Sequence, residues 1–154
     1  MKNQLQPVFT MKPLFIGIFT TISTLAMAQS SVLNEAFLQS FADAFNAHDL
    51  NAIMNSMTDD CVFQASAGPD VDGETFQGQA EVRKAFENVF KTFPDARWSN
   101  PRHLIIGDRG ISEWTFSGTK SDGTRVEVTG CDLFTFRNGK IAVKNSYRKN
   151  RIPQ

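Results

Sequence analysis

Residues 124–149 read TRVEVTGCDLFTFRNGKIAVKNSYRK, and this stretch decides the fold. Asn138-Gly139 separates two segments in which apolar and polar residues alternate, a pattern typical of an antiparallel β-hairpin. Counting in twos along the first segment places six residues on one face: Val126, Val128, Gly130, Asp132, Phe134 and Phe136. That face is apolar except for one carboxylate, so Asp132 is the first candidate functional residue.

The setting of Asp132 allows two interpretations. A carboxylate without a partner in apolar surroundings holds its proton more tightly than one in water, and it then serves as a proton donor or acceptor near neutral pH. A carboxylate held by a buried Arg, such as Arg125 or Arg102, is instead a structural anion, and a slipped register would turn it to water. The first interpretation makes Asp132 the candidate acid or base.

Helices are predicted in the part of the chain that precedes most of the sheet. Apolar residues recur there at helix spacing in three segments. The first segment carries Leu33, Phe37, Phe41, Ala44 and Phe45; the second, after the N-cap residue Asp49, carries Leu50, Ile53, Met54 and Met57; the third, after Gly78, carries Val82, Phe86, Val89, Phe90 and Phe93. Each helix therefore has one apolar face that must cover another element.

The remaining strands complete the sheet. Alternation or short apolar runs predict strands at Cys61–Ala65, Arg102–Ile106, Gly110–Lys120, Thr124–Phe136 and Lys140–Lys149. The predicted fold class is α+β: a cone-shaped, curved, mostly antiparallel sheet wraps around the long N-terminal helix, with three helices on one face. Such a cone leaves a pocket at its open end.

The N-terminal segment is predicted to be a signal peptide rather than part of the fold. Lys12 precedes the apolar run Leu14–Ala26, and Ala26-Met27-Ala28 supplies the small-residue ending of a secretory signal. The run is short for a bilayer span, so we expect no stable membrane anchor; a membrane-anchored helix is the alternative. Cleavage after Ala28 leaves one domain, residues 29–154, in the periplasm or outside the cell.

Charge and motif content exclude several classes of protein. Lys2 and Lys12 leave with the signal, which reduces Lys and Arg from 16 to 14 against 16 Asp and Glu, a net charge of −2. Such a chain has no general attraction to nucleic acid. The sequence has no HExxH or CxxC spacing and no Gly-rich phosphate loop, so neither a metal nor a cofactor is expected.

Two cysteines remain in the mature chain, Cys61 and Cys131. Cys131 neighbours Asp132 in its strand and so points to the opposite face. We expect two buried thiols, although export to an oxidising compartment leaves a disulfide open.

Several short motifs, in this order, resemble one known family. They are Phe41–Leu50, Met57–Phe63, Phe76–Ala80, Phe93–Asp95 and Gly130–Ile141. The chain is similar to the nuclear transport factor 2-like superfamily, in particular to SnoaL-like polyketide cyclases and ketosteroid isomerases. The resemblance implies a cone-shaped domain that often forms a homodimer through the outer face of its sheet. It does not specify function, because this superfamily contains enzymes, ligand binders and protein-interaction modules.

The resemblance to the isomerases covers only part of their catalytic groups. Asp132 matches the protonated Asp of their oxyanion site. Ala65 stands where they have a general base, and Phe41 stands where they have an oxyanion Tyr. Steroid isomerisation by that mechanism is therefore not expected. Tyr147 matches a Tyr that is common in the cyclases, and Lys149 stands where an acid is usual.

Strand parity predicts the pocket lining. Ile141, Val143, Asn145 and Tyr147 fall on one face of the last strand, and Trp114 and Phe116 share a face of theirs. The predicted lining around Asp132 is Phe41, Phe63, Ala65, Trp114, Phe116, Phe134, Asn145 and Tyr147. The basic residues Lys144, Arg148, Lys149 and Arg151 are expected on a solvated edge and tail.

An apolar pocket with few polar groups predicts a small-molecule site. The expected ligand is a small apolar molecule that bears a carbonyl group, bound with or without isomerase- or cyclase-like proton transfer. The alternative is an interaction module whose aromatic residues simply fill the cone.

Overall fold

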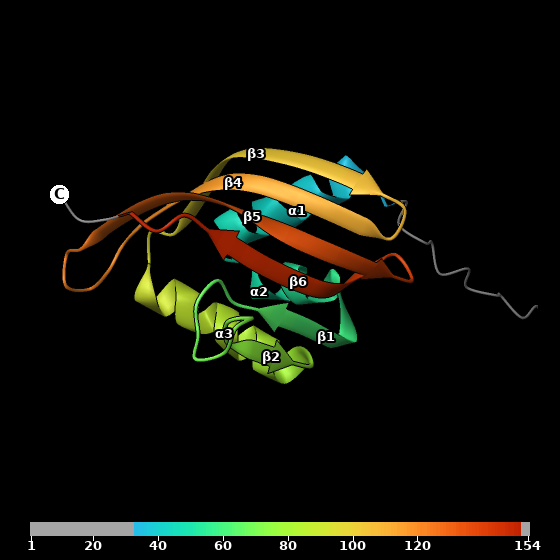
Figure 1. Ribbon diagram of the computed structural model, residues 1–154, viewed down its shortest axis with the longest axis horizontal. Helices are drawn as coiled ribbons and strands as arrows, with labels where there is room; N and C mark the ends of the chain where they lie inside the picture. The colour runs from blue at the N-terminus through green and yellow to red at the C-terminus, as the bar shows by residue number, and fades with distance from the viewer. Residues whose placement is uncertain (1–32, 152–154) are drawn as a thin grey trace, which may run out of the picture.

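The computed structural model describes residues 33–151, so the predicted signal peptide of residues 1–28 lies outside the described part of the chain. The elements in chain order are α1 (Glu35–Asn46), α2 (Leu50–Asn55), β1 (Met57–Gln64), β2 (Thr75–Gln77), α3 (Gln79–Thr92), β3 (Arg97–Ile106), β4 (Arg109–Thr119), β5 (Arg125–Arg137) and β6 (Lys140–Arg148). Figure 1 shows the long strands β3 to β6 in front of α1 and α2, with α3 below beside β1 and β2. Within the described residues, no helix is long and apolar enough to span a bilayer.

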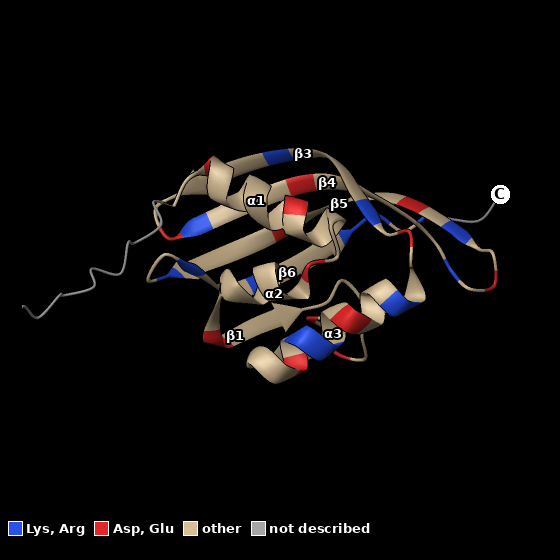
Figure 2. Cartoon of the chain, turned by 180° about the vertical axis from the view of Figure 1, so that it is seen from behind, with Lys and Arg blue, Asp and Glu red and all other residues tan. Residues whose placement is uncertain are grey.

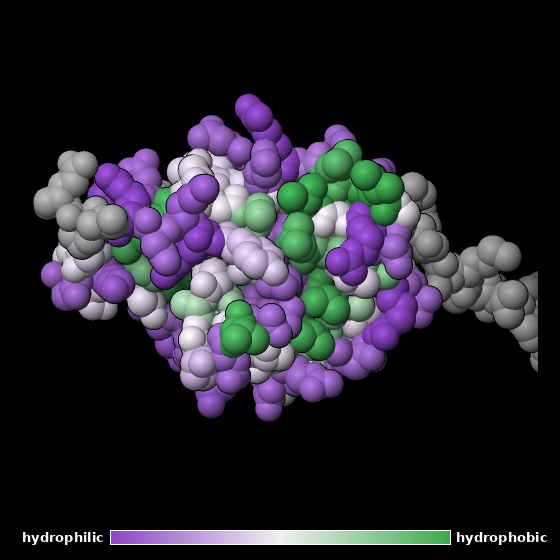
Figure 3. Space-filling view, in the orientation of Figure 1, coloured by the Kyte–Doolittle hydropathy of each residue, from purple (hydrophilic) through white to green (hydrophobic). Residues whose placement is uncertain are grey.

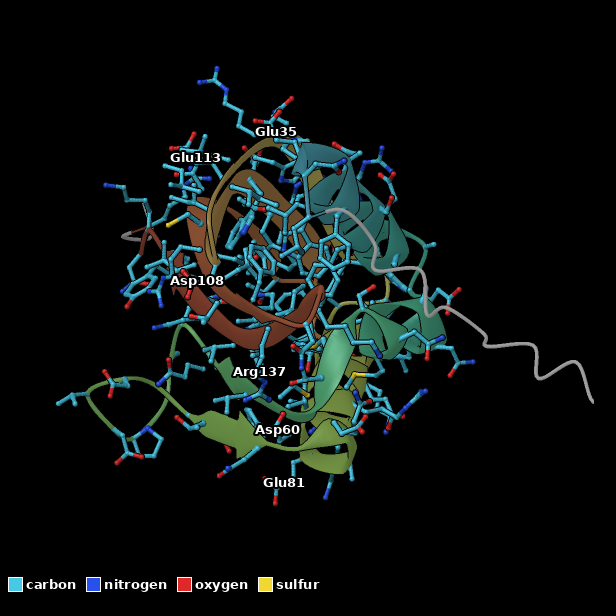
Figure 4. All side chains as sticks on the ribbon, turned by 90° about the vertical axis from the view of Figure 1, so that its right-hand side faces the viewer. Glu35, Asp60, Glu81, Asp108, Glu113 and Arg137 are labelled. Carbon is cyan, nitrogen blue, oxygen red and sulfur yellow. The ribbon has the colours of Figure 1, made fainter. Side chains whose placement is uncertain are left out.

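One sheet contains all six strands, in the order β2-β1-β6-β5-β4-β3. Neighbouring strands are antiparallel except β1 and β6, which run parallel. Figure 4 looks along the sheet and shows that it curls around an interior filled with side chains. The predicted α+β fold, with a curved, mostly antiparallel sheet and three helices, is confirmed. The short strand β2 and the early start of β3 were not predicted from the alternation of residues.

Capping side chains fix where the first two helices begin. At the start of α1, Asn34 Oδ1 accepts a hydrogen bond from the Phe37 N–H at 3.1 Å. At the start of α2, Asp49 Oδ1 accepts from the N–H groups of Asn51 and Ala52, each at 3.0 Å. These bonds satisfy donors that have no partner within their own helix.

Aromatic side chains from the helices and the sheet form the core. Phe41 of α1 packs edge-to-face against Phe134 of β5, with ring centroids 5.9 Å apart. Phe45 contacts Trp98 of β3 in a similar geometry at 5.2 Å, and Phe86 of α3 at 5.0 Å. The apolar faces of the helices therefore meet the inner face of the curved sheet, as their spacing predicts.

A β-bulge interrupts β6 near its start. Thr135 pairs with Val143, but the next residue of β5, Phe136, pairs with Ile141. Ala142 is therefore an extra residue in β6, without an opposite partner in β5. Because side chains alternate with a period of two, one extra residue turns every later side chain of the strand to the other face.

This bulge makes part of the predicted pocket lining wrong. Asp132 lies opposite Ser146, so Ser146 shares the inner face, and Lys144 is buried on the same face. Asn145 and Tyr147 lie on the outer face of the sheet, where Tyr147 is 52% exposed. Counting in twos from Ile141 without the bulge places Asn145 and Tyr147 on the inner face and Lys144 on the outer face.

Candidate functional site

A buried ion pair lies inside the cone where β5 meets β6. Lys144 Nζ donates a hydrogen bond to Asp132 Oδ1 at 2.7 Å, and the two side chains are only 9% and 8% exposed. Removing either ion from water costs several kcal/mol, so each ion needs the other as a close partner. The buried cation beside Asp132 is therefore Lys144, rather than the Arg102 or Arg125 considered from the sequence.

Two further side chains complete the surroundings of Asp132. Ser146 Oγ donates to Asp132 Oδ1 at 2.6 Å and accepts from Lys144 Nζ at 2.7 Å. Trp114 Nε1 donates to Asp132 Oδ2 at 2.9 Å. Three accepted hydrogen bonds suit an ionised carboxylate, which has acceptor sites and no donor.

Aromatic rings surround the ammonium group on its other side. Lys144 Nζ lies 5.0 Å from the ring centroid of Phe63 and 5.7 Å from that of Phe45. Both distances fall within the range of cation–π attraction, which favours the charged amine in this apolar setting. The sequence therefore builds a fixed positive charge into the wall of an aromatic interior.

A cavity of about 360 Å³ opens beside the ion pair, between α3, β1 and the inner face of the sheet. Phe63, Ala65, Trp114 and Phe116, which the sequence analysis placed around Asp132, line this cavity, whereas Asp132 itself does not. This volume lies in the range of small-molecule sites, so the outer part of the cone is open rather than filled.

Polar groups enter this apolar cavity from two sides. Lys144 and Ser146 line it from β6. Glu74 lines it from the segment before β2, and among the residues that the structure describes it is the only carboxylate that does so. The cavity therefore combines a cation, a hydroxyl and a carboxylate with aromatic walls.

The inner part of the cone holds a much smaller cavity of about 30 Å³. Phe41, Phe134 and Asp132 line it, together with His103. His103 Nδ1 lies 2.7 Å from Ser112 Oγ, whereas its buried Nε2 has no hydrogen-bond partner among the described residues. Burial lowers the pKa of His103. A space of this size, lined by several polar side chains as well as aromatic rings, fits a water molecule rather than a substrate.

Lys144, Ser146 and Glu74 are site residues that the sequence analysis missed. Lys144 was assigned to a solvated basic edge, yet it is buried, whereas Arg148, Lys149 and Arg151 are exposed as predicted. The run Ile141-Ala142-Val143 contains three consecutive apolar residues in an otherwise alternating strand. Such a break in alternation is the signal of a bulge, and it places Lys144 inside.

Both cysteines are free thiols, Cys61 in the core and Cys131 half-buried on the outer face of β5. Cys131 lies on the outer face of β5 and Asp132 on the inner face, which confirms that Cys131 points away from Asp132. Burial raises the pKa of each thiol. Across residues 33–151, no group of three or more His, Cys, Asp or Glu side chains could hold a metal ion.

Comparison with known proteins supports the assignment of the fold. The family model described as SnoaL-like domain matches residues 38–144, which include the cavity walls and the ion pair. No curated protein matches the chain in sequence.

Three solved structures illustrate the likeness in fold. A proposed polyketide cyclase from Pseudomonas putida KT2440 is 20% identical with a TM-score of 0.65, over 72% of this chain and 87% of that one. A protein with a ketosteroid isomerase-like fold from Catenulispora acidiphila, solved with trimethylamine, is 16% identical with a TM-score of 0.66, over 75% and 86%. TerC, co-crystallised with polyporic acid, is 21% identical with a TM-score of 0.62, over 74% and 88%. These likenesses show the nuclear transport factor 2-like fold.

Proposed function

This chain belongs to the SnoaL-like domain family, and from that premise we propose that it binds an apolar, carbonyl-bearing small molecule and acts on it by proton transfer, as an isomerase or cyclase. One observation carries the proposal. A single cavity of about 360 Å³ brings aromatic walls together with the Lys144 ammonium, the Ser146 hydroxyl and the Glu74 carboxylate.

Lys144 binds the carbonyl oxygen in this proposal, and Ser146, whose single O–H already donates to Asp132, orients the ammonium group. Two of the three N–H bonds of Lys144 point to Asp132 and Ser146, so one N–H is left for a ligand oxygen. A charge-assisted hydrogen bond of this kind contributes roughly 1.5–3 kcal/mol to binding. The same positive charge stabilises the enolate oxygen that forms when a proton leaves the neighbouring carbon.

Glu74 is the proposed base. The Ala65 N–H donates to the Glu74 carbonyl oxygen at 2.9 Å, so Glu74 lies across from Ala65 at the end of the β1–β2 pair. Ala65 occupies the position at which the isomerases have their general base. Glu74 thus lines the cavity from the segment that precedes β2 instead.

Asp132 supports Lys144 in this proposal. Its carboxylate lines the small inner cavity rather than the larger one, and the Ser146 hydroxyl stands between it and the larger cavity. Asp132 therefore pairs with Lys144 and orients its ammonium group. The acid or base role predicted for Asp132 from the sequence then requires a proton relay through a hydrogen-bonded neighbour, because Trp114, Lys144 and Ser146 line the larger cavity and Asp132 does not.

Exchange of the α-protons of beta-tetralone in D2O, followed by NMR, tests the proposal. The wild-type protein should accelerate exchange above the buffer rate, and it should bind beta-tetralone more tightly than tetralin, which has no carbonyl group. Glu74→Gln should slow exchange by about 10²–10⁴-fold with little change in binding, because it removes the base alone. Asp72→Asn removes a carboxylate from the same exposed loop, does not touch the cavity, and serves as the matched control.

The outcomes separate an enzyme from a non-catalytic binder. Binding of beta-tetralone without faster exchange would reject proton transfer and leave a carrier of hydrophobic ligands. The exposure of Glu74 favours that alternative, because the proposed base is surrounded by water. Failure to bind either compound would reject the small-molecule site itself and favour a protein-interaction module.

Export is proposed from the signal predicted at residues 1–28. The exported protein should then begin at Gln29 in the periplasm or medium. An intact-mass measurement on that fraction tests the proposal, and a mass that retains Leu14–Ala26 would contradict it.

A homodimer through the outer face of the sheet is proposed as well. Leu104 and Ile106 are 48% and 69% exposed there, next to Ile111 and Leu133. Figure 3 shows apolar residues in green over the corresponding ends of β3 to β6. Sedimentation velocity should show a dimer for the wild type and a monomer for Ile106→Lys, because a buried unpaired charge opposes association. A wild-type monomer would reject the dimer.

A further inference from the structure

A basic groove adjoins the mouth of the apolar cavity. It measures about 720 Å³ and lies between the β4–β5 hairpin and the residues at the end of β6. Its cationic side chains are Lys120, Arg125, Arg148, Lys149 and Arg151. Figure 2 shows Lys and Arg in blue on both segments, which lie side by side at the same end of the sheet.

The basic groove and the cavity adjoin each other. Phe93 and Arg148 line both of them. Phe93 packs edge-to-face on Phe116 of the cavity wall, with ring centroids 5.2 Å apart. Val126 and Val128 extend the apolar floor into the groove. One elongated molecule can therefore lie across both spaces without leaving apolar contact.

The cations of the basic groove outnumber the acids near it. Glu127 is the only carboxylate that lines the groove within residues 33–151, and no described groove cation lies within ion-pair distance of a carboxylate. The Asp95 carboxylate accepts hydrogen bonds from the Thr119 N–H and hydroxyl, which lower the pKa of Asp95 more than the charge of Arg125 does. This accumulation stands out in a chain whose 16 Lys and Arg are balanced by 16 Asp and Glu.

We propose that the ligand of this protein is an amphipathic anion, with an apolar carbonyl-bearing body in the cavity and a carboxylate, sulfate or phosphate group in the basic groove. The proposal rests on the proposed function for the apolar body, and it adds the chemical class of the second group. Clustered cations at the entrance attract such an anion, and guanidinium groups bind its oxygens by charge-assisted hydrogen bonds. Because the floor between the groove and the cavity is apolar, the apolar body and the anionic group can belong to one molecule.

Two fluorescent probes with nearly the same ring system test this inference. Anilinonaphthalene sulfonate carries an anionic group, and N-phenyl-naphthylamine does not. The wild type should bind the sulfonate more tightly than the neutral probe, and added NaCl should weaken only the sulfonate, because salt screens exposed charges.

Matched variants show which part of the protein binds the sulfonate group. Arg125→Gln/Arg151→Gln, at two exposed positions that line the groove and not the cavity, should weaken sulfonate binding by about fivefold to tenfold, since each exposed charge contact contributes a few-fold, and should leave the neutral probe unchanged. Lys84→Gln/Lys140→Gln removes the same charge from exposed positions outside the groove and should change neither affinity. Ala65→Phe narrows the cavity and should weaken both probes.

Each outcome points to one of the two proposals. If neither probe binds the wild type, the small-molecule site proposed above fails. If both probes bind equally, or if the Arg variant weakens both alike, the cavity stands and the anionic group is rejected. If the sulfonate binds Ala65→Phe as it binds the wild type, it occupies another surface, and the single-ligand inference is overturned.

Discussion

Replacing Asp132 with Asn removes the charge of the buried carboxylate and keeps its shape. Asp132 Oδ1 accepts from Lys144 and Ser146, and Oδ2 accepts from Trp114. Asn offers one oxygen and one NH₂ group, so its amide donor must face either the ammonium or the indole N–H. Lys144 also loses its counter-ion while its side chain stays 9% exposed.

The expected cost follows from these contacts. An uncompensated charge in a buried pair destabilises a protein by about 3–5 kcal/mol, and the misplaced amide donor adds to the same loss. A loss of this size is a large part of the 5–15 kcal/mol that typically separates folded from unfolded domains. For a domain of this length the melting temperature should fall by roughly 10–20 °C.

Thermal and urea unfolding at neutral pH measure this loss. The control is Asp60→Asn in the exposed pair of Asp60 with Arg137, labelled in Figure 4, which should change stability far less because water screens that pair. Asp132→Asn/Lys144→Met removes both buried charges and should regain most of the lost stability.

Two results would refute the reasoning. A melting temperature of Asp132→Asn within about 2 °C of the wild type would show that Asp132 is not a buried structural anion. It would restore the interpretation of Asp132 as a protonated pocket acid. A double variant less stable than the single variant would show that the loss does not come from the unpaired ammonium.

Three further predictions concern other parts of the fold. Gly130→Ala should lower the free energy of unfolding by about 1–3 kcal/mol, because a Cβ there meets a backbone oxygen of β6 and an indole ring; a urea titration equal to the wild type would contradict this. His103→Asn should flatten the pH dependence of stability. Burial lowers the pKa of His103 from its ordinary 6.5, so as the pH falls below that value the unfolded state binds the proton first and the wild type loses stability. If the melting temperatures of both proteins change by the same amount between pH 7.5 and 5.5, the prediction is wrong. A thiol reagent without reductant should label Cys131 in the folded protein and Cys61 only after denaturation. Labelling of Cys131 should be faster at higher pH, because burial raises its pKa and the thiolate is the reactive form. A failure to label two thiols after denaturation would reveal a disulfide.

The sequence predicted most of the fold because its signals are local and periodic. The apolar residues of Glu35–Asn46 recur at helix spacing, and the face they predict is the face that is buried. The Asn-Gly pair predicted the hairpin, and both residues adopt the positive φ that such a turn requires. Strand β2 has three residues, too few to show an alternation.

The sequence by itself determined the elements, their apolar faces and the position of Asp132 on the inner face of β5. Only the tertiary structure decided the partners of Asp132. One extra residue, Ala142, turned Lys144 and Ser146 inward and Asn145 and Tyr147 outward, and a bulge depends on pairing between two strands rather than on one strand's own pattern. The meeting of Glu74 with Lys144 around one cavity was decided in the same way, because residues far apart in the chain come together only when the sheet curls around the helices.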